Sequence, residues 1–553
     1  MHQITSLTLL LAPSFLLLYA LAVILNVRKS FTLSKKTIES LGWFGIIVSI
    51  ASAVIVFNLG TTQSSLLGYK DLGFAIRLDS LSITMLTMIS LLGFIILKFS
   101  TNYLDGDSRK HIFIARLATT IASVELLVLS GNLGQLLVFW IITSVCLHYL
   151  LVFYRTRPQA IAAARKKFIV ARLGDVSLLI ATVLIYTNLG TGDLSKIFNS
   201  VQATGFLNTP LTVATVFLVI AAVLKSAQFP THGWLIEVVE TPTPVSALLH
   251  AGLLNAGPFL IVRMGFLMSE SSAASLMLII IGGFTAMFAS VVFLTQPTVK
   301  VSLGYSSVAH MGFSLLVCGF GVYSAAILHL VAHSFYKGHS FLSSGSAIDA
   351  VRAKKVSLPK RTGSFWRIGL SILFSLSVYA FFCYLWGIQP EKEFGLMAIG
   401  AIIVMGLSQI LAQTFDSNGT IRAMLQSAFM IIIVAGTFFI LEKGAHILLE
   451  SQIPVAYTPS LAIKFSVIAL ISCFVLVVLL QLAAPNLKSG KFSRQLGIHL
   501  RNGFYANVIF DRIVGSLKSN KFKWANLTVK EEDELEKILF QNQINQKNTI
   551  INN

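Results

Sequence analysis

Runs of about twenty predominantly apolar residues recur along nearly the whole chain, and this feature limits the possible folds most strongly. A helix of about that length spans the hydrocarbon core of a bilayer. The runs are continuously apolar and do not alternate, which favours helices over a β-barrel. We predict an all-α, polytopic integral membrane protein with about fifteen transmembrane helices. Their expected positions are 4–26, 41–59, 79–100, 111–129, 132–154, 167–190, 211–229, 243–268, 273–295, 299–320, 323–346, 364–387, 394–414, 420–441 and 462–484.

Composition supports a membrane protein and argues against a nucleic-acid-binding one. Hydrophobic residues make up 55% of the chain and charged residues 12%, whereas about a quarter of a soluble domain is charged. The net charge is +19, but the basic residues lie mainly in short loops and in the tail. Such a distribution suits an anionic membrane surface, and no basic groove module is legible.

The positions of the basic residues predict the topology. With the N-terminus outside, the loops that face the cytoplasm carry Arg28, Lys29, Lys35, Lys36, Arg109, Lys110, Arg155, Arg157, Arg165, Lys166, Lys167, Arg352, Lys354, Lys355, Lys360 and Arg361. The outside loops are poor in Lys and Arg, so the positive-inside rule predicts an N-out, C-in orientation. The tail after residue 485 is expected to begin with an amphipathic cytoplasmic segment and to end in disorder.

Lys225 is the first ionisable residue that needs an explanation at membrane depth. It ends the apolar run LTVATVFLVIAAVL, and Pro230, Pro242 and Pro244 interrupt helical hydrogen bonding soon after it. A broken helix inside a bundle can expose backbone groups to ions or water. The alternative is a lysine whose head group reaches the interface at the end of its helix.

A second polar cluster lies in HLVAHSFYKGHSFLSSG, where His329, His333 and Lys337 are spaced four residues apart and share one helix face. A stripe of this kind can relay a proton. A zinc site is a competing interpretation, but no third ligand is in register and Lys337 would repel the metal. A further alternative is that these histidines only form hydrogen bonds within the bundle and have no role in transport.

Three other ionisable residues are candidates for the same pathway. His250 follows the double-proline segment directly. Asp175 can pair either with Arg172, three residues away, or with Lys225. Glu125 lies well inside an expected helix, where a carboxylate is either protonated, paired with a cation or hydrogen-bonded to a neighbour.

The sequence contains no phosphate loop, nucleophile elbow, dinucleotide fingerprint or haem motif. We therefore expect no catalytic site, no metal and no cofactor on this chain. The chemistry that its residues offer is the movement of protons or other cations.

Several long motifs resemble the antiporter-like subunits of respiratory complex I, Mrp-type sodium/proton antiporters and related carbon-uptake complexes. They are RLDSLSITMLTMISLLGFIILKFSTNYL, ARLGDVSLL, LKSAQFPTHGWLIEVVETPTPVSALLHAG, VKVSLGYSSVAHMGFSLL and AILHLVAHSFYKGHSFLSSGS. The resemblance implies two inverted five-helix repeats, each with a broken helix. It also implies that Lys225 is the central protonatable group, and that His250, His329, His333 and Lys337 form a hydrated relay.

The sequence departs from the family pattern at two carboxylate or lysine positions. The family glutamate follows a tryptophan, but here Ile141 follows Trp140, and Glu125 is a candidate replacement. The stretch that matches the second broken helix offers only Gln409 and Gln413, and the long lateral helix of the distal complex I subunit is missing. These departures are typical of the DabB-type membrane subunits of inorganic-carbon accumulation complexes, with a proton-pumping NADH dehydrogenase or a Mrp antiporter as alternatives.

In those complexes the membrane subunit is paired with a DabA-type partner, a large zinc protein that resembles β-carbonic anhydrases. The resemblance thus implies that zinc and carbon dioxide hydration belong to the partner, docked on the cytoplasmic face. The expected organisation is N-terminal flanking helices at 1–110, a first repeat at 111–268, a second repeat at 269–441, a C-terminal transmembrane region at 442–484 and a basic tail at 485–553.

Overall fold

The computed structural model describes most of the chain, and the described part is almost entirely helical. It covers residues 10–24, 35–154, 157–238, 241–345, 364–389, 393–416, 420–454, 459–483 and 491–516. Within these ranges twelve helices are long and apolar enough to cross a membrane. A multi-pass, all-α membrane fold is thereby confirmed, while the count of about fifteen stays a prediction.

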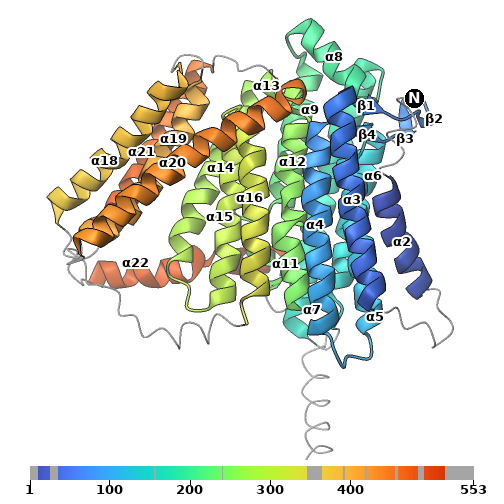
Figure 1. Ribbon diagram of the computed structural model, residues 1–553, viewed down its shortest axis with the longest axis horizontal. Coiled ribbons are helices and arrows are strands. Elements are labelled where there is room, and N and C mark those ends of the chain that lie inside the picture. The colour runs from blue at the N-terminus through green and yellow to red at the C-terminus, as the bar shows by residue number, and fades with distance from the viewer. Residues whose placement is uncertain are drawn as a thin grey trace, which may run out of the picture. The chain divides into compact units, whose positions relative to one another are not determined.

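The first part of the chain is a bundle of helices that run side by side, with short strands at one end (Figure 1). The elements are α2 (Leu11–Ile24), α3 (Lys35–Leu59), β1 (Thr62–Gln63), β2 (Leu67–Tyr69), β3 (Leu72–Phe74), β4 (Arg77–Leu78), α4 (Ser80–Tyr103), α5 (Lys110–Val128), α6 (Leu133–Leu151), α7 (Pro158–Leu189) and α8 (Leu194–Thr204). β1 pairs with β4 and β2 with β3, both antiparallel. We call the end that carries the strands and α8 the strand end.

A buried group of ion pairs joins elements at the strand end. Asp79 is fully buried and caps α4, since its Oδ1 accepts a hydrogen bond from the Ser82 amide at 2.7 Å. Its Oδ2 lies 2.6 Å from Arg77 Nε and 2.5 Å from Arg263 Nη1. Burial alone would raise the pKa of the Asp79 carboxyl, but the Arg263 and Arg77 guanidiniums hold this pKa well below its usual range.

The predicted break after Lys225 is confirmed. The elements are α9 (Thr209–Lys225), α10 (Gly233–Glu237), α11 (Thr243–Ala251), a 3₁₀ turn (Leu253–Asn255) and α12 (Ala256–Arg263). Pro230 lies in the turn between α9 and α10. Pro242 is the N-cap of α11 and Pro244 lies in its first turn, where a proline costs no hydrogen bond, so these two residues begin a helix.

A second break was not predicted, because no proline marks it. The expected single helix at 243–268 is interrupted after Ala251, where Gly252 has φ −129° and ψ −58°. The Asn255 side chain donates from Nδ2 to the Ala251 carbonyl at 2.9 Å and to Ser334 Oγ at 2.7 Å. A side-chain amide therefore satisfies a carbonyl that the interrupted helix leaves free.

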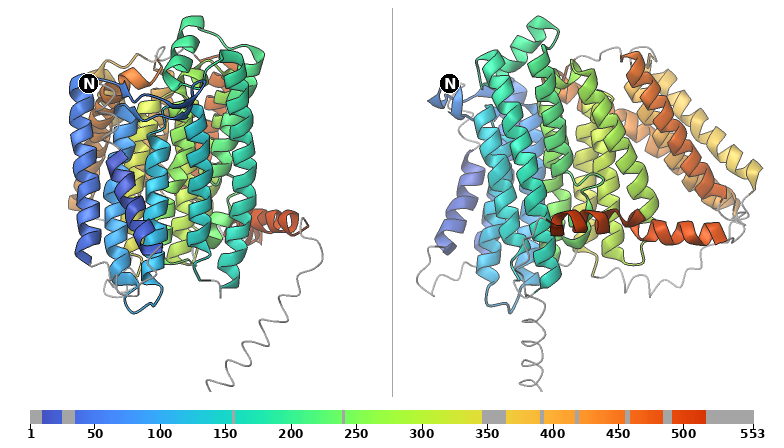
Figure 2. Two further views of the ribbon diagram at one scale, coloured as in Figure 1. Left: turned by 90° about the vertical axis from the view of Figure 1, so that its right-hand side faces the viewer. Right: turned by 180° about the vertical axis from the view of Figure 1, so that it is seen from behind.

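The second part of the chain adds two groups of helices and a short helix that runs across the end of the bundle (Figures 1 and 2). The elements are α13 (Gly265–Ser269), α14 (Ser272–Phe293), α15 (Val299–Gly319), α16 (Tyr323–Leu342), α18 (Phe365–Trp386), α19 (Phe394–Phe415), α20 (Ile421–Leu449), a 3₁₀ turn (Glu450–Gln452), α21 (Leu461–Ala483) and α22 (Lys491–Arg501). The backbones of α14 and α15 lie close together at Gly282 and Gly312. A Cβ added at position 282 would lie only 2.7 Å from the Gly312 carbonyl oxygen, so glycine permits this approach. α20 packs against both α16 and α19.

The amphipathic segment predicted at the start of the tail is α22. It runs along the end of the bundle opposite the strands (Figure 2). Gln296, just beyond α14, donates from Nε2 to the Arg501 carbonyl at 3.1 Å and so attaches the end of α22. Residues 506–516 form α23 (Ala506–Ser516) within a separate compact unit.

Two helix boundaries differ from the predictions, and one helix was not predicted. α7 begins at Pro158, so Arg165, Lys166 and Lys167 are helical and do not form the expected loop. α20 continues past residue 441 to Leu449 and therefore contains Glu442. The amphipathic helix α8 was not predicted, because its apolar face is too short for the pattern of a membrane span.

The ion pairs of Asp79 generate a stability prediction. Asp79→Asn leaves two buried guanidiniums without their counter-charge, which costs about 3–5 kcal/mol. We expect a clearly lower unfolding temperature in detergent, measured by intrinsic fluorescence. Asp71→Asn is the control, because it breaks the largely exposed 2.9 Å pair with Lys196 and should cost less than about 1 kcal/mol. Equal losses in the two variants would contradict a structural role specific to Asp79.

Candidate cation-translocation site

Lys225 points into the bundle and does not reach towards an interface. It ends α9 at the first break, and its Nζ donates to Ser144 Oγ at 2.7 Å and to the Trp140 carbonyl at 3.1 Å. The same Nζ lies 4.3 Å from the centre of the Trp140 ring. All three contacts come from α6, so the ammonium group is held by a carbonyl, a hydroxyl and an aromatic face.

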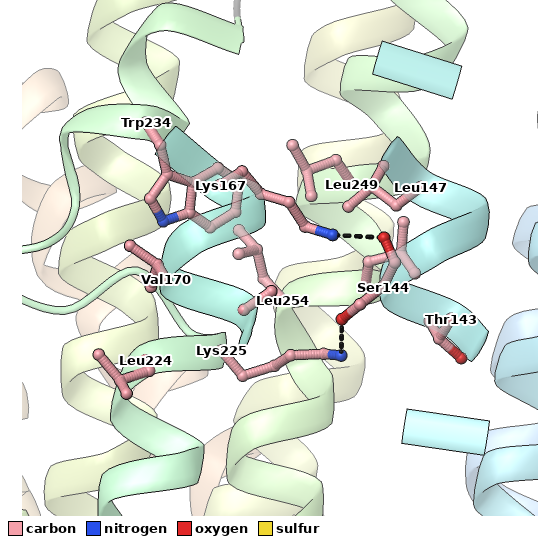
Figure 3. Close-up of a pocket in the computed structure, with 12 residues that line it drawn as sticks. Thr143, Ser144, Leu147, Lys167, Val170, Leu224, Lys225, Trp234, Leu249 and Leu254 are labelled. Atoms are coloured by element: carbon pink, nitrogen blue, oxygen red, sulfur yellow. Dashed lines mark hydrogen bonds between the residues drawn. The ribbon is translucent and has the colours of Figure 1, made fainter. Parts of the chain in front are cut away.

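A second buried lysine shares the same serine (Figure 3). Lys167 of α7 is 5% exposed and donates to the Ser144 carbonyl at 2.6 Å. Both ammonium groups border a narrow cavity, lined also by Trp234 and Leu249, that has room for about one water molecule. Lys166, its neighbour, forms an ion pair with Glu237, which joins α7 to α10 beyond the break.

Only one carboxylate interacts with this pair of lysines in the described structure. Asp175 interacts electrostatically with both Lys225 and Lys167. Its ion pair, however, is with Arg172, at 2.6 Å. Ser144 and the Trp140 carbonyl occupy the contacts of Lys225, and neutral acceptors stabilise an ammonium less than a carboxylate does.

His250 and Lys337 lie near the second break. His250 lies in the last turn of α11, is fully buried and stacks on Phe341 with ring centroids 4.3 Å apart. Neither of its ring nitrogens has a hydrogen-bond partner among the described residues. Lys337 is also fully buried, donates to the Leu303 carbonyl at 3.1 Å and interacts electrostatically with His250. The packing of α11 against α16 therefore brings two sites together that are distant in sequence.

Three histidine rings continue this row along α16. His310 of α15 lies with its ring centroid 5.2 Å from that of His329 and 5.0 Å from that of His333. His329 and His333, one turn apart on α16, are 6.1 Å apart. In the part of the chain that the structure describes, no group of three or more His, Cys, Asp or Glu side chains has a geometry that could hold a metal ion.

A cavity of about 420 Å³ reaches the histidine cluster from the side of α19 and α21. His310 and His329 line it, together with Gln409, which donates from Nε2 to Gln481 Oε1 at 2.6 Å. The resemblance implied a second broken helix in this stretch, and that expectation is wrong, because α19 is continuous from Phe394 to Phe415. The side chain of Gln413 lies outside the described part of the structure. A neutral amide pair thus lies where the resemblance would place a charged residue.

Glu125 is not part of the Lys225 cavity. It is 1% exposed, and its Oε1 accepts a hydrogen bond from Ser90 Oγ at 2.9 Å. It lines a separate small pocket with residues of α2, α3 and α4. Its contacts correspond to one of the predicted alternatives, hydrogen bonding to a neighbour. The described geometry does not support Glu125 as a replacement for the carboxylate missing beside Trp140.

Sequence reasoning missed Lys167, Ser144 and His310. Lys167 ends the basic run ARKK, which is typical of a loop that faces the cytoplasm, and only the early start of α7 buries it. Ser144 is one of many serines in apolar helices. His310 lay within the motif SSVAHMG, so it was the one residue of the three that the resemblance could have provided.

The comparisons with known proteins agree with this arrangement. A family model described as NADH:quinone oxidoreductase/Mrp antiporter matches residues 130–388, and one for the N-terminus of complex I chain 5 matches residues 66–114. The "Probable inorganic carbon transporter subunit DabB2" of Halothiobacillus neapolitanus is 35% identical over 525 residues, covering 92% of this chain and 93% of the relative. The chain belongs to the family of antiporter-like membrane subunits that includes the DabB proteins.

Two further similarities extend the comparison. The "Probable inorganic carbon transporter subunit DabB" of Hydrogenovibrio crunogenus is 32% identical over 405 residues, covering 67% of this chain and 78% of the relative. A chain in the structure of the Mrp complex from Dietzia sp. DQ12-45-1b aligns with a TM-score of 0.60 and 22% identity, covering 96% of this chain and 63% of that one. The latter similarity shows the fold alone.

Lys225 is held by neutral groups and Arg263 by a carboxylate, so replacing each by methionine should change the stability of the protein differently. Lys225→Met removes a cation that is held by neutral groups, and replacing such a charge with an apolar side chain is often neutral or stabilising. Arg263→Met deprives buried Asp79 of a counter-charge and should cost up to about 3–5 kcal/mol. We expect the unfolding temperature in detergent to be unchanged or higher for the first variant and lower for the second. Equal destabilisation would mean that Lys225 has a structural role.

Proposed function

We propose that this chain is the membrane subunit of an energy-coupled inorganic-carbon pump, conducting protons or sodium ions down their gradient. Lys225 is the central switch of this pathway. His250, Lys337, His333 and His329 form the relay, and Asp175 modulates the charge at Lys225. The chain itself carries no catalytic site in this proposal, since hydration of carbon dioxide to bicarbonate belongs to a partner.

The single observation that carries cation movement is the row of buried and half-buried titratable side chains on both sides of the two helix breaks. A buried ionisable group costs free energy in a membrane protein and is retained where it has a function. Lys225 and Lys337 are held by neutral groups, and His250 and His333 have ring nitrogens without partners among the described residues. Lys225 lines the narrow cavity, and His329 lines the larger one. A purely structural scaffold leaves these costs without explanation.

The nature of the transported substrate rests on the relatives. The chain spans nearly the full length of a relative named as an inorganic carbon transporter subunit. We infer a zinc-containing, carbonic-anhydrase-like partner on the cytoplasmic face of the bacterial inner membrane, with this chain oriented N-out and C-in. Basic α22 and the ends of the helices opposite the strands would then face that partner.

A second candidate is a proton-translocating subunit of an NADH dehydrogenase or of a Mrp-type antiporter. The description of the family model that matches residues 130–388 favours it. The neutral Gln409–Gln481 pair and the missing carboxylate beside Trp140 argue against it. Affinity purification of the tagged chain decides between the two candidates: flavin and iron–sulfur subunits, or several antiporter subunits, would favour the second.

Growth of a carbonic-anhydrase-deficient bacterial host in air tests the proposed function. This chain together with its zinc partner should restore growth, and Lys225→Ala should abolish the rescue because no group remains to carry the charge at the first break. Growth rate and bicarbonate accumulation are the measurements.

Lys98→Ala is the matched control, because its ammonium is half exposed and forms a 3.4 Å pair with Glu39 on the bundle surface. It should support growth close to that of the wild type, with equal abundance of both variants in the membrane. Full rescue by Lys225→Ala would refute the role of Lys225.

A further inference from the structure

Glu442 is a buried carboxylate that the sequence analysis left outside the membrane helices. It lies about two turns before the end of α20, within the apolar run IIIVAGTFFILEKGAHILL. Its side chain is buried, with the residue 8% exposed. The Oε1 atom accepts a hydrogen bond from Ser324 Oγ, at the start of α16, at 2.8 Å. The charged pair Glu-Lys after an apolar run is typical of a helix end, which is why the residue was overlooked.

A cavity of about 170 Å³ adjoins this carboxylate at the strand end. This space is far more than one ordered water molecule needs. Residues of the α15–α16 turn, of α20 and of the segments before α19 and α21 line it, including Gly321, Glu393, Pro454 and Pro459. Glu393 is exposed, so the cavity extends from the surface at the strand end to Glu442.

No ion pair neutralises Glu442 within the described ranges, although charged and titratable groups surround the cavity. The cavity lining includes three such residues, Lys443, His446 and Glu393, and all three are exposed. Tyr379 of α18 interacts electrostatically with Glu442 and donates its own hydrogen bond to the Leu396 carbonyl. The direct polar contact of the Glu442 carboxylate is therefore the neutral Ser324 hydroxyl, whereas the buried Asp79 carboxylate has two guanidiniums.

We propose that Glu442 is a water-accessible, proton-binding carboxylate that links the strand-end cavity to α16 through its hydrogen bond from Ser324. Its ligand is a proton delivered by water in the cavity. This role rests on the proposed function for its use in transport, but the proton-binding site itself does not.

The hydrogen bond from Ser324 connects the carboxylate on α20 to α16, the helix that carries His329. Ser324 and His329 are five residues apart, a rise of about 7.5 Å along the helix.

Chemical labelling of the wild-type chain tests the site without reference to transport. The purified full-length protein is treated with a water-soluble carbodiimide and glycinamide, and the modified peptides are quantified by mass spectrometry. Exposed Glu393, on the same cavity, is the positive control. Glu125, buried in a separate small pocket, is the negative control. We expect modification of Glu442 within about tenfold of Glu393, and little at Glu125. Reactivity as low as that of Glu125 would overturn the proposal.

Function is tested in the complex with its partner. Glu442→Gln should lower proton uptake and growth rescue at least tenfold, Glu442→Asp should retain part of both, and Glu39→Gln, on the bundle surface away from this cavity, should behave like the wild type. Each variant is first checked for equal membrane abundance. Wild-type activity of Glu442→Gln would overturn the role in transport, whereas failure of the wild-type complex to support growth would refute the proposed function and leave the labelling result valid.

Discussion

An ammonium group inside a membrane bundle must find acceptors for its protons, and most of the backbone acceptors there are already used within helices. The arrangement around Lys225 answers this constraint. The lysine ends α9 at a break and takes a hydroxyl and a carbonyl from α6. Lys167 approaches the same serine from α7. The packing of α6, α7 and α9 is therefore organised around two positive charges rather than around a continuous apolar seam.

Buried charges in this protein fall into two groups with different consequences. Asp79, Arg77 and Arg263 form a set in which one carboxylate is the ion-pair partner of both guanidiniums. Lys225 and Lys337 have neutral acceptors instead. The first arrangement stabilises the strand end. The second stores free energy in groups that can gain or lose a proton, which is the property expected of a translocation pathway.

The sequence predicts those features that a local pattern marks. Three prolines indicate the break after Lys225, and four-residue spacing places His329, His333 and Lys337 on neighbouring turns of α16. The second break has no proline, since Gly252 and the Asn255 amide produce it through contacts with α16 that only the tertiary structure provides. Lys167 and Glu442 were missed for a related reason: charged residues at the edge of an apolar run look like helix ends, whereas packing extends both helices past them.

The shortage of carboxylates along the row suggests how its members influence one another. Asp175 is engaged by Arg172, Glu125 lies in a separate pocket, and Gln409 is neutral. Around Lys337, His250 and the α15–α16 histidines, whose electrostatic interactions within the described structure are with other bases, a positive charge on one member raises the free energy of a charge on the next, most strongly where the dielectric constant is low. Such groups titrate as a coupled set, and charging one site favours discharge of its neighbour. Repulsion between cations, rather than a fixed network of ion pairs, can thus couple Lys337 to His250 and to the histidines of α15 and α16.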